Sequence, residues 1–371
     1  MGFGAMFAGH LNATVVEEIQ GALTTGMLFV TPSPTSTDAA EMICKRFKID
    51  QVRFTNSGTE STMYAVRVAR SASDKMGILK VEGGYHGSYD PFVVSAKPPL
   101  DKAGDPEEPT AVMDSNLVPG DIYVVPYNNA PALEAMFEKN ASKIACFIVE
   151  PVLENLAIIL PDAGYLERVR ELCDEYNVIL IFDEVKTGLT AGAHGASVRL
   201  GVEPDLITLA KSIGGGVPLA AFGGKKKYMD FVTNGKMAHF GTFNGNPLAM
   251  AGVRAIDRLC SDQALADAEA LNQQALDRIS EIIDEYQLPA HTVGFGVKGC
   301  VTWSTTPVRN YRDYKATDFG IAEAHWLFAL NRGIITPPGL DEQWLISLAH
   351  GQTEIDLLVE DFREFAKALR A

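Results

Sequence analysis

The chain has 371 residues, of which 47% are hydrophobic and 21% are charged, and its formal net charge is −15. This balance and length predict a globular protein with a large core, organised as one large domain and a smaller one. The acidic net charge disfavours nucleic acid or an anionic membrane as a partner, and no apolar run approaches the roughly 20 residues of a membrane helix. Five scattered cysteines without a CxxC pair favour free thiols in the cytoplasm, and no signal peptide is expected.

Short apolar runs alternate along the chain with amphipathic stretches. The expected strands are residues 51–55, 78–81, 122–125, 144–149, 178–182, 206–209 and 219–222. Helical patterns between them are residues 61–72, 130–139 and 165–176. Strands that alternate with helices of this length predict an α/β protein with a mainly parallel sheet.

The rest of the chain differs in character. Residues 97–120 are rich in Pro and Asp, which predicts a long surface excursion. A helical region is expected from residue 246 to about residue 286, with a break after residue 260. The remainder contains an expected strand at 297–303, a helix at 318–331, a strand at 344–348 and a last helix at 354–369. These elements predict a separate small α+β unit.

The segment after the first strand has the composition of a phosphate-binding turn. Asn56-Ser57-Gly58-Thr59-Glu60 opens a helix, and its hydroxyls, its glycine and the free helix N–H groups suit a phosphate. The same residues also make an ordinary N-cap, which is the commoner meaning of such a motif taken alone.

Two further strand ends carry unusual residues. Asp183 follows the strand at 178–182, where it either caps the next turn or pairs with a protonated heterocyclic nitrogen. Lys211 stands between an apolar strand and the run Gly214-Gly215-Gly216. A lysine deprived of water has a lowered pKa and becomes nucleophilic, which suits Schiff base chemistry. The alternative, a phosphate-loop lysine, lacks the preceding glycine of the Walker order. Ligands of open α/β sheets bind beyond the carboxyl ends of the strands. A phosphate seat, an Asp and a Lys there are the parts that a pyridoxal phosphate (PLP) site requires.

Six motifs in one order resemble the class III aminotransferases of PLP fold type I. They are QVRFTNSGTESTMY from residue 51, EGGYHGS from 82, VEP from 149, IFDEVKTGL from 181, PDLITLAKSIGGGVPLAAFGG from 204 and GTFNGNPLAMAG from 241. The pattern is most similar to glutamate-1-semialdehyde 2,1-aminomutase and its transaminase relatives, and WLISLAH from residue 344 fits the same family.

The resemblance implies roles for particular residues. Lys211 would form the Schiff base and move protons, and Asp183 would pair with the pyridinium nitrogen. Val185 and Tyr85 would cover the two faces of the ring. The remaining cofactor-binding residues would be Ser57, Gly58 and Thr59 at the phosphate, His86, Glu150 and Asn155 near the ring or the substrate, and Thr242 at the phosphate of the neighbouring subunit. No metal ligand is expected.

The resemblance also implies a division of the chain. Residues 1–20 would be a remnant of the small domain, residues 21–260 the large PLP-binding domain, and residues 261–371 a helical connection and the small C-terminal α+β domain. Relatives have a further segment before the point where this sequence begins. Lys186 and Ser88-Tyr89-Asp90 depart from the aminomutase pattern, which favours a transaminase relative.

The sequence therefore predicts a cytoplasmic, homodimeric, PLP-dependent aminotransferase that moves an amino group between an amino acid and a keto acid. One alternative is glutamate-1-semialdehyde 2,1-aminomutase, in which the transfer is intramolecular and gives 5-aminolevulinate. Another is an N-terminally shortened PLP-binding protein with little activity.

Overall fold

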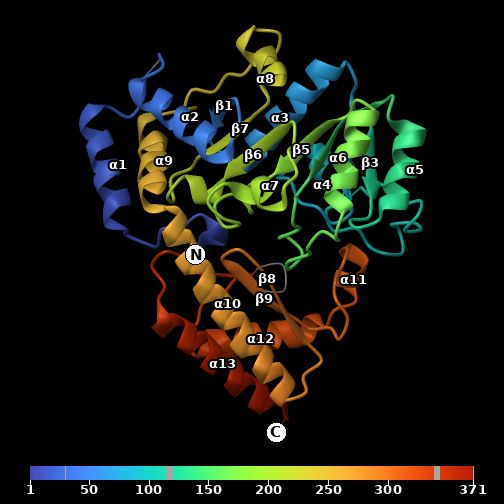
Figure 1. Cartoon of the computed structure of the whole chain (residues 1–371), viewed down its shortest axis with the longest axis vertical. Coiled ribbons are helices and arrows are strands. Elements are labelled where there is room, and N and C mark those ends of the chain that lie inside the picture. The colour runs from blue at the N-terminus through green and yellow to red at the C-terminus, as the bar shows by residue number, and fades with distance from the viewer. Residues whose placement is uncertain (30, 114–119, 338–342, 371) are drawn as a thin grey trace.

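A large α/β unit and a smaller α+β unit make up the chain (Figure 1). The computed structural model describes residues 1–29, 31–113, 120–337 and 343–370. A short 3-10 helix, η1 (Gly2–Gly4), begins the chain close to the boundary between the units. Residues 114–119 of the predicted surface excursion lie outside the described residues.

The large unit is built on a seven-stranded sheet with the order β1-β7-β6-β5-β4-β2-β3. The strands are β1 (Gln51–Thr55), β2 (Gly77–Val81), β3 (Ile122–Val125), β4 (Ile144–Val149), β5 (Ile179–Asp183), β6 (Leu206–Ala210) and β7 (Ala220–Gly224). Only β7 is antiparallel to its neighbours, β1 and β6. The mainly parallel mixed sheet is thus confirmed, with small shifts at some strand ends.

Helices cover both faces of this sheet (Figure 1). They are α1 (Ala13–Thr25), α2 (Pro34–Phe47), α3 (Gly58–Ser73), α4 (Asp90–Val93), α5 (Ala130–Asn140), α6 (Tyr165–Glu175), α7 (Gly195–Leu200), α8 (Lys226–Thr233) and α9 (Pro247–Leu259). Side chains alternate along β5, so that Ile179 and Ile181 pack in the core with α3 and α8, whereas Leu180 and Phe182 join the core of the opposite face. Because both faces are buried, an inner strand such as β4 is apolar throughout.

The helices α1 and α2 were not predicted from the sequence. Helix α1 packs along α9, where Glu18 pairs with Arg254 and Arg258. Helix α2 begins with a capping box between Ser33 and Ser36. In both cases tertiary packing supports a helix whose own sequence pattern is weak.

Among its described residues, the small unit contains a three-stranded antiparallel sheet and four helices (Figure 1). The strands are β8 (His291–Phe295), β9 (Lys298–Thr302) and β10 (Trp344–Leu345), and the helices are α10 (Asp262–Glu285), α11 (Tyr311–Lys315), α12 (Phe319–Asn331) and α13 (Gln352–Arg370). The α+β composition predicted for this region is confirmed. Strand β8 was missed, because its half-buried side chains and its glycine give no clear alternation. The predicted domain boundaries stay predictions.

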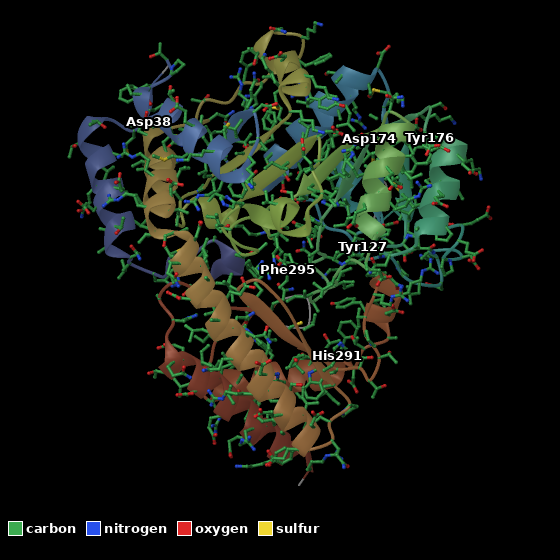
Figure 2. The ribbon with its side chains drawn as sticks, viewed as in Figure 1. Asp38, Tyr127, Asp174, Tyr176, His291 and Phe295 are labelled. Atoms are coloured by element: carbon green, nitrogen blue, oxygen red, sulfur yellow. The ribbon has the colours of Figure 1, made fainter. Side chains whose placement is uncertain are left out.

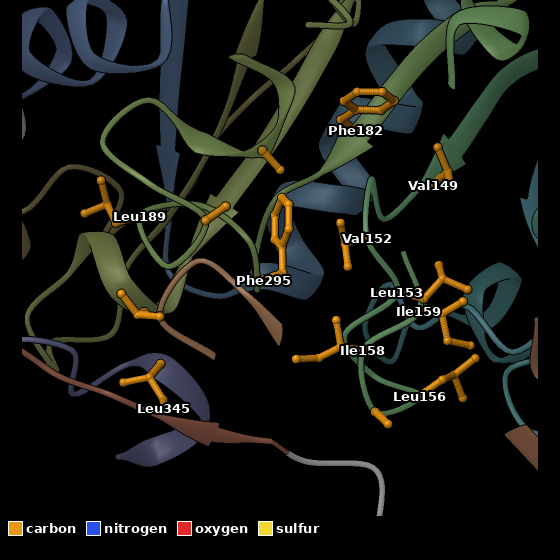
Figure 3. Close-up of a cluster of buried hydrophobic side chains, with 14 of the residues drawn as sticks. Val149, Val152, Leu153, Leu156, Ile158, Ile159, Phe182, Leu189, Phe295 and Leu345 are labelled. Atoms are coloured by element: carbon orange, nitrogen blue, oxygen red, sulfur yellow. The ribbon is translucent and has the colours of Figure 1, made fainter. Parts of the chain in front are cut away.

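The hairpin of β8 and β9 contacts the large unit through an apolar core. Phe295, at the end of β8 that points toward the large unit, is labelled together with His291 at the other end in Figure 2. Figure 3 shows Phe295 between Leu189 and Val152 of the large unit, near Phe182 of β5. The hairpin therefore packs against the segment that follows Asp183, where it also bonds to the backbone of Lys186 and Thr190.

Two features are absent from the part of the chain that the structure describes: a helix able to span a membrane and a disulfide. No helix there combines the length and the apolar content that crossing a bilayer requires. All five cysteines are free thiols, and four of them are buried.

Candidate active site

The carboxyl ends of three strands bring the predicted site residues together. Strand β1 runs in the same direction as β6, because both are antiparallel to β7. The turn after β1, Asp183 at the end of β5 and Lys211 directly after β6 therefore lie at one edge of the sheet. They surround a cavity of about 170 Å³. It is lined by Gly58, Thr59, Thr62, Tyr85, His86, Gly87, Glu150, Asn155, Asp183, Val185, Lys186, Ala210 and Lys211.

The carboxylate of Asp183 is held at both oxygens. Its Oδ2 lies 2.7 Å from Nδ1 of His86, and its Oδ1 accepts hydrogen bonds from Oγ1 of Thr208 at 2.9 Å and from the backbone N–H of Val185 at 3.0 Å. Asp183 is only 3% exposed. A buried carboxylate with a fixed orientation is suited to keep a proton on a ring nitrogen that lies within hydrogen-bond distance of it.

His86 is itself fixed from several sides. Its backbone carbonyl accepts a hydrogen bond from Oγ1 of Thr62 at 2.7 Å, and its ring packs edge-on against Phe92. Among the described residues, its Nε2 is buried without a hydrogen-bond partner. Such an atom at the wall of a cavity points to a ligand or a water molecule as its partner.

Lys211 is the first residue after β6 and opens the short 3-10 helix η2 (Lys211–Ile213). Its φ of +49° lies in the left-handed region, which is costly for a lysine and typical of functional sites. Burial, and then the positive charges of Lys186 and Lys298, lower the pKa of Lys211 to about 8. The amine is therefore neutral far more often than a solvated lysine, and a neutral amine is a nucleophile.

The turn that presents Lys211 packs closely against the neighbouring helix. Helix α9 contacts η2 so closely that a Cβ on Gly252 would lie 2.4 Å from the carbonyl oxygen of Gly214. Gly252 therefore lets the turn rest on α9, whereas Gly215 and Gly216, with φ of +61° and +97°, provide the backbone conformation of the turn.

The turn after β1 supplies both an N-cap and part of the cavity wall. Ser57 is exposed and accepts a hydrogen bond from the N–H of Glu60 at 3.3 Å, as an N-cap does. Gly58 and Thr59 line the cavity, and Oγ1 of Thr59 accepts from the N–H of Ser88 at 3.2 Å. The N-cap is thus confirmed, whereas phosphate binding by this turn stays a prediction, and Ser57 itself is not part of the lining.

The two residues expected at the ring faces lie at the same cavity. A Cβ on Gly58 would lie 3.1 Å from Cγ1 of Val185, a tight contact that would require the Val185 side chain to shift by a few tenths of an ångström. Tyr85 is 44% exposed, and its N–H donates to Oε1 of Glu150 at 3.2 Å. Oε2 of Glu150 accepts from Nδ2 of Asn155 at 2.8 Å, and burial raises the pKa of Glu150.

Thr242 does not reach this cavity. It is exposed and lies in a separate hollow, beside Phe240 and Phe243, which are 83% and 61% exposed. Within the chain, then, Thr242 is apart from the other predicted site residues.

A larger cavity of about 650 Å³ adjoins the first and shares Tyr85, Asn155, Lys186 and Lys211 with it. Its remaining lining comes from Phe3, Gly83, Val93, Ser95 and Ala96, and from the segment expected as a surface excursion: Lys97, Pro98, Pro99, Lys102, Val112 and Met113. That segment is thus a cavity wall, a role that its loop-like composition could not reveal.

Two buried lysines near the site were not selected as site residues from the sequence. Lys186 and Lys298 are 5% and 3% exposed, and both contact Glu154, which is fully buried. A lysine inside an otherwise apolar segment, as in Gly296-Val297-Lys298-Gly299-Cys300, was the available signal.

The residues around the small cavity fit PLP. A helix N-terminus can take a phosphate, Asp183 can pair with the pyridine nitrogen, and the Lys211 amine can bond to the aldehyde carbon. The glycine beside Val185 and the unpartnered Nε2 of buried His86 are further signs of a site shaped for a bound group.

Comparisons with known proteins agree with this geometry. The family model for aminotransferase class III matches residues 1–322. A glutamate-1-semialdehyde 2,1-aminomutase from Francisella philomiragia is 36% identical over 361 residues, which cover 95% of this chain and 82% of the relative. An omega-transaminase from Sphaerobacter thermophilus superposes with a TM-score of 0.93 at 29% identity, covering 99% of this chain and 86% of that one.

A solved glutamate-1-semialdehyde aminomutase variant from Pseudomonas aeruginosa PAO1, in complex with PMP, has a TM-score of 0.89 at 25% identity and covers 99% of this chain and 82% of that one. The fold is therefore PLP fold type I, and the cofactor is pyridoxal 5′-phosphate. This chain belongs to the class III aminotransferases, as a PLP-dependent transaminase or an aminomutase of that family.

Proposed function

We propose that this enzyme is a transaminase that exchanges an amino group between an amino acid and a keto acid, and that the carbonyl product leaves before the second substrate enters. The observation that carries this proposal is the larger cavity beside Lys211. Its lining includes the exposed residues Lys97, Pro99 and Lys102, so it reaches the surface of the described chain. An aminomutase must instead retain its intermediate in a closed site, which requires a lid that excludes water.

The chain's own residues supply binding and proton transfer in this proposal. Bound PLP supplies an aldehyde that captures amines and a ring that withdraws electrons from the substrate carbon. Nζ of Lys211 would hold the cofactor through its aldehyde carbon in the resting enzyme and, once an incoming amine has displaced it, would accept and return the proton of the substrate carbon. Asp183 keeps a proton on the ring nitrogen, and His86 orients the Asp183 carboxylate. Val185 and Tyr85 pack against the two faces of the ring.

The phosphate would be bound at the N-terminus of α3, by Gly58 and Thr59 with Ser57 at the cap. Glu150 and Asn155, hydrogen-bonded to each other, would face the ring edge or the substrate. These assignments rest on the positions of the residues around the small cavity and on the family to which the chain belongs.

A homodimer is part of the same proposal. Thr242 lies on a surface that exposes large apolar side chains: Leu28, Phe29, Phe240 and Phe243. Such a surface favours contact with another protein chain, and a closed two-fold pair would place each Thr242 near the partner's phosphate.

Glutamate-1-semialdehyde 2,1-aminomutase is the second candidate, because a relative of that name is 36% identical over nearly the whole chain. The test supplies glutamate-1-semialdehyde alone and, separately, an amino acid with a keto acid. We expect turnover only in the two-substrate assay. Formation of 5-aminolevulinate without a second substrate, at rates well above the two-substrate reaction, would overturn the transaminase proposal.

A further inference from the structure

The hairpin of the small unit brings a charged side chain into contact with Lys186 and Glu154, two residues of the large unit close to the cavity. Strands β8 and β9 turn at Gly296 and Val297, and the N–H of Val297 donates to the carbonyl of Thr190 at 3.0 Å. Lys298 is the next residue and is only 3% exposed. Docking of the hairpin on Thr190 therefore carries the Lys298 ammonium into the large unit.

Lys298 joins two segments of the large unit there. Its Nζ donates to Oε2 of Glu154 at 2.5 Å and to the carbonyl oxygen of Lys186 at 2.9 Å. From beside β10, Nε2 of Gln343 donates to the carbonyl oxygens of Glu154 and Ala157. Two residues next to the small sheet thus hold Glu154 by both its side chain and its backbone.

Both segments continue directly into the cavity wall. The N–H of Glu154 donates to Oε2 of Glu150 at 3.1 Å, and Glu150 holds the backbone of Tyr85 through its other oxygen. In the second segment, Lys186, whose carbonyl oxygen accepts from Lys298, follows Asp183 and Val185 in the sequence, and these residues line the cavity. One ammonium group of the small unit therefore connects to residues on several sides of the cavity.

A buried ion pair is costly, because two charges must lose their hydration, so its presence is weak evidence of a stabilising role. A charge in this low-dielectric region acts on its neighbours much more strongly than it would in water. We infer that Lys298 is a positioning residue whose buried ammonium couples the placement of the small unit to the reactivity of Lys211. This inference rests on the proposal that Lys211 is the reactive amine.

The pKa of Lys211 is shifted in the direction that this inference requires. After burial, the largest causes of its lowered pKa are the charges of Lys186 and Lys298, opposed by Asp183 and Glu150. The other titratable side chains that line its cavities are Tyr85, His86, Lys97 and Lys102. Loss of the Lys298 charge should raise the pKa of Lys211, and loss of the Glu154 charge should lower it.

The test measures how fast the apoprotein captures added PLP as a function of pH, read from the visible absorption of the linked cofactor. The variants are Lys298→Met, Glu154→Gln, the double variant and Lys298→Arg. We expect the pH midpoint of capture to rise by about half a unit or more in Lys298→Met and to fall in Glu154→Gln. Lys298→Arg should restore the wild-type midpoint.

Opposite shifts from breaking the same ion pair separate an electrostatic role from a structural one. Lys367→Met is the matched control, because Lys367 pairs with Glu364 on the surface of α13. Unchanged midpoints, or shifts in the same direction, would overturn the inference. Should one single variant fail to fold, the other decides by its direction: Lys298→Met must still raise the midpoint, and Glu154→Gln must still lower it. If wild-type apoprotein does not attach PLP at Lys211, the proposed function fails instead.

Discussion

Nδ1 of His86 lies 2.7 Å from Oδ2 of Asp183, and both residues are almost fully buried. The pair joins the EGGYHGS motif after β2 to the end of β5, far apart in the sequence. Thr208 holds the other carboxylate oxygen. Orientation of the Asp183 carboxylate therefore depends on three separate segments of the chain.

Asp183→Asn should leave the fold intact but lower the rate of the first half-reaction by roughly 100-fold or more, because an amide cannot hold a proton on the pyridine nitrogen. Stopped-flow absorbance with an amino donor measures the rate, and circular dichroism checks the fold. Asp356→Asn, at an exposed carboxylate on α13, is the control and should keep wild-type rates. Wild-type activity of Asp183→Asn would exclude the proposed role.

His86→Leu should lower the same rate by about tenfold, because Asp183 loses one of its orienting partners. His86→Asn should recover part of the loss, since its Nδ2 can occupy the position of Nδ1. The comparison of kcat with KM for the two variants checks this. If His86→Leu and His86→Asn lower the rate equally, the ring acts through its packing against Phe92 and not through its hydrogen bond to Asp183.

Lys211→Ala should abolish the covalent link to PLP. In the wild type, a pKa of about 8 leaves roughly a tenth of the Lys211 amine neutral at pH 7, so cofactor capture should accelerate as pH rises toward 8 and level off above it. Borohydride reduction followed by peptide mapping identifies the linked lysine. Labelling of Lys225 or Lys186 in place of Lys211 would contradict the assignment.

Thr242→Ala should weaken PLP retention by about tenfold if each Thr242 contacts the partner subunit's phosphate. Mixing Thr242→Ala with Lys211→Ala subunits should give heterodimers in which one site carries both defects and the other carries neither. Recovery of activity on mixing, compared with either variant alone, measures this. A monomer with full activity at high dilution would rule out the shared site.

Gly296→Ala should lower the free energy of unfolding by about 2 kcal/mol or more. Gly296 has φ of +59°, and a Cβ there would lie 2.1 Å from the carbonyl oxygen of Thr190. Urea denaturation of the apoprotein measures the loss. Gly333→Ala is the control, because Gly333 also has a positive φ but has open space around it. Its loss of stability therefore measures the backbone strain alone, and the additional loss in Gly296→Ala measures the clash with Thr190.

Local patterns were enough to identify the large sheet and the residues at its carboxyl edge. Buried strands such as β4 and β5 are apolar throughout, and a strand ends where Asp183 or Lys211 interrupts that run. Because parallel strands meet at one edge, the proximity of Asp183 and Lys211 followed from sequence order alone.

Tertiary structure decided what local patterns could not encode. The partner of Asp183 is His86, the partner of Lys298 is Glu154, and the wall of the larger cavity comes from the segment around Pro98. These contacts join residues about 100 or more positions apart or depend on an irregular loop, so no periodicity announces them. In the sequence, the buried lysine of β9 is only an interruption of an apolar strand. Only the docking of the β8–β9 hairpin on the large unit shows that this charge is close enough to lower the pKa of Lys211.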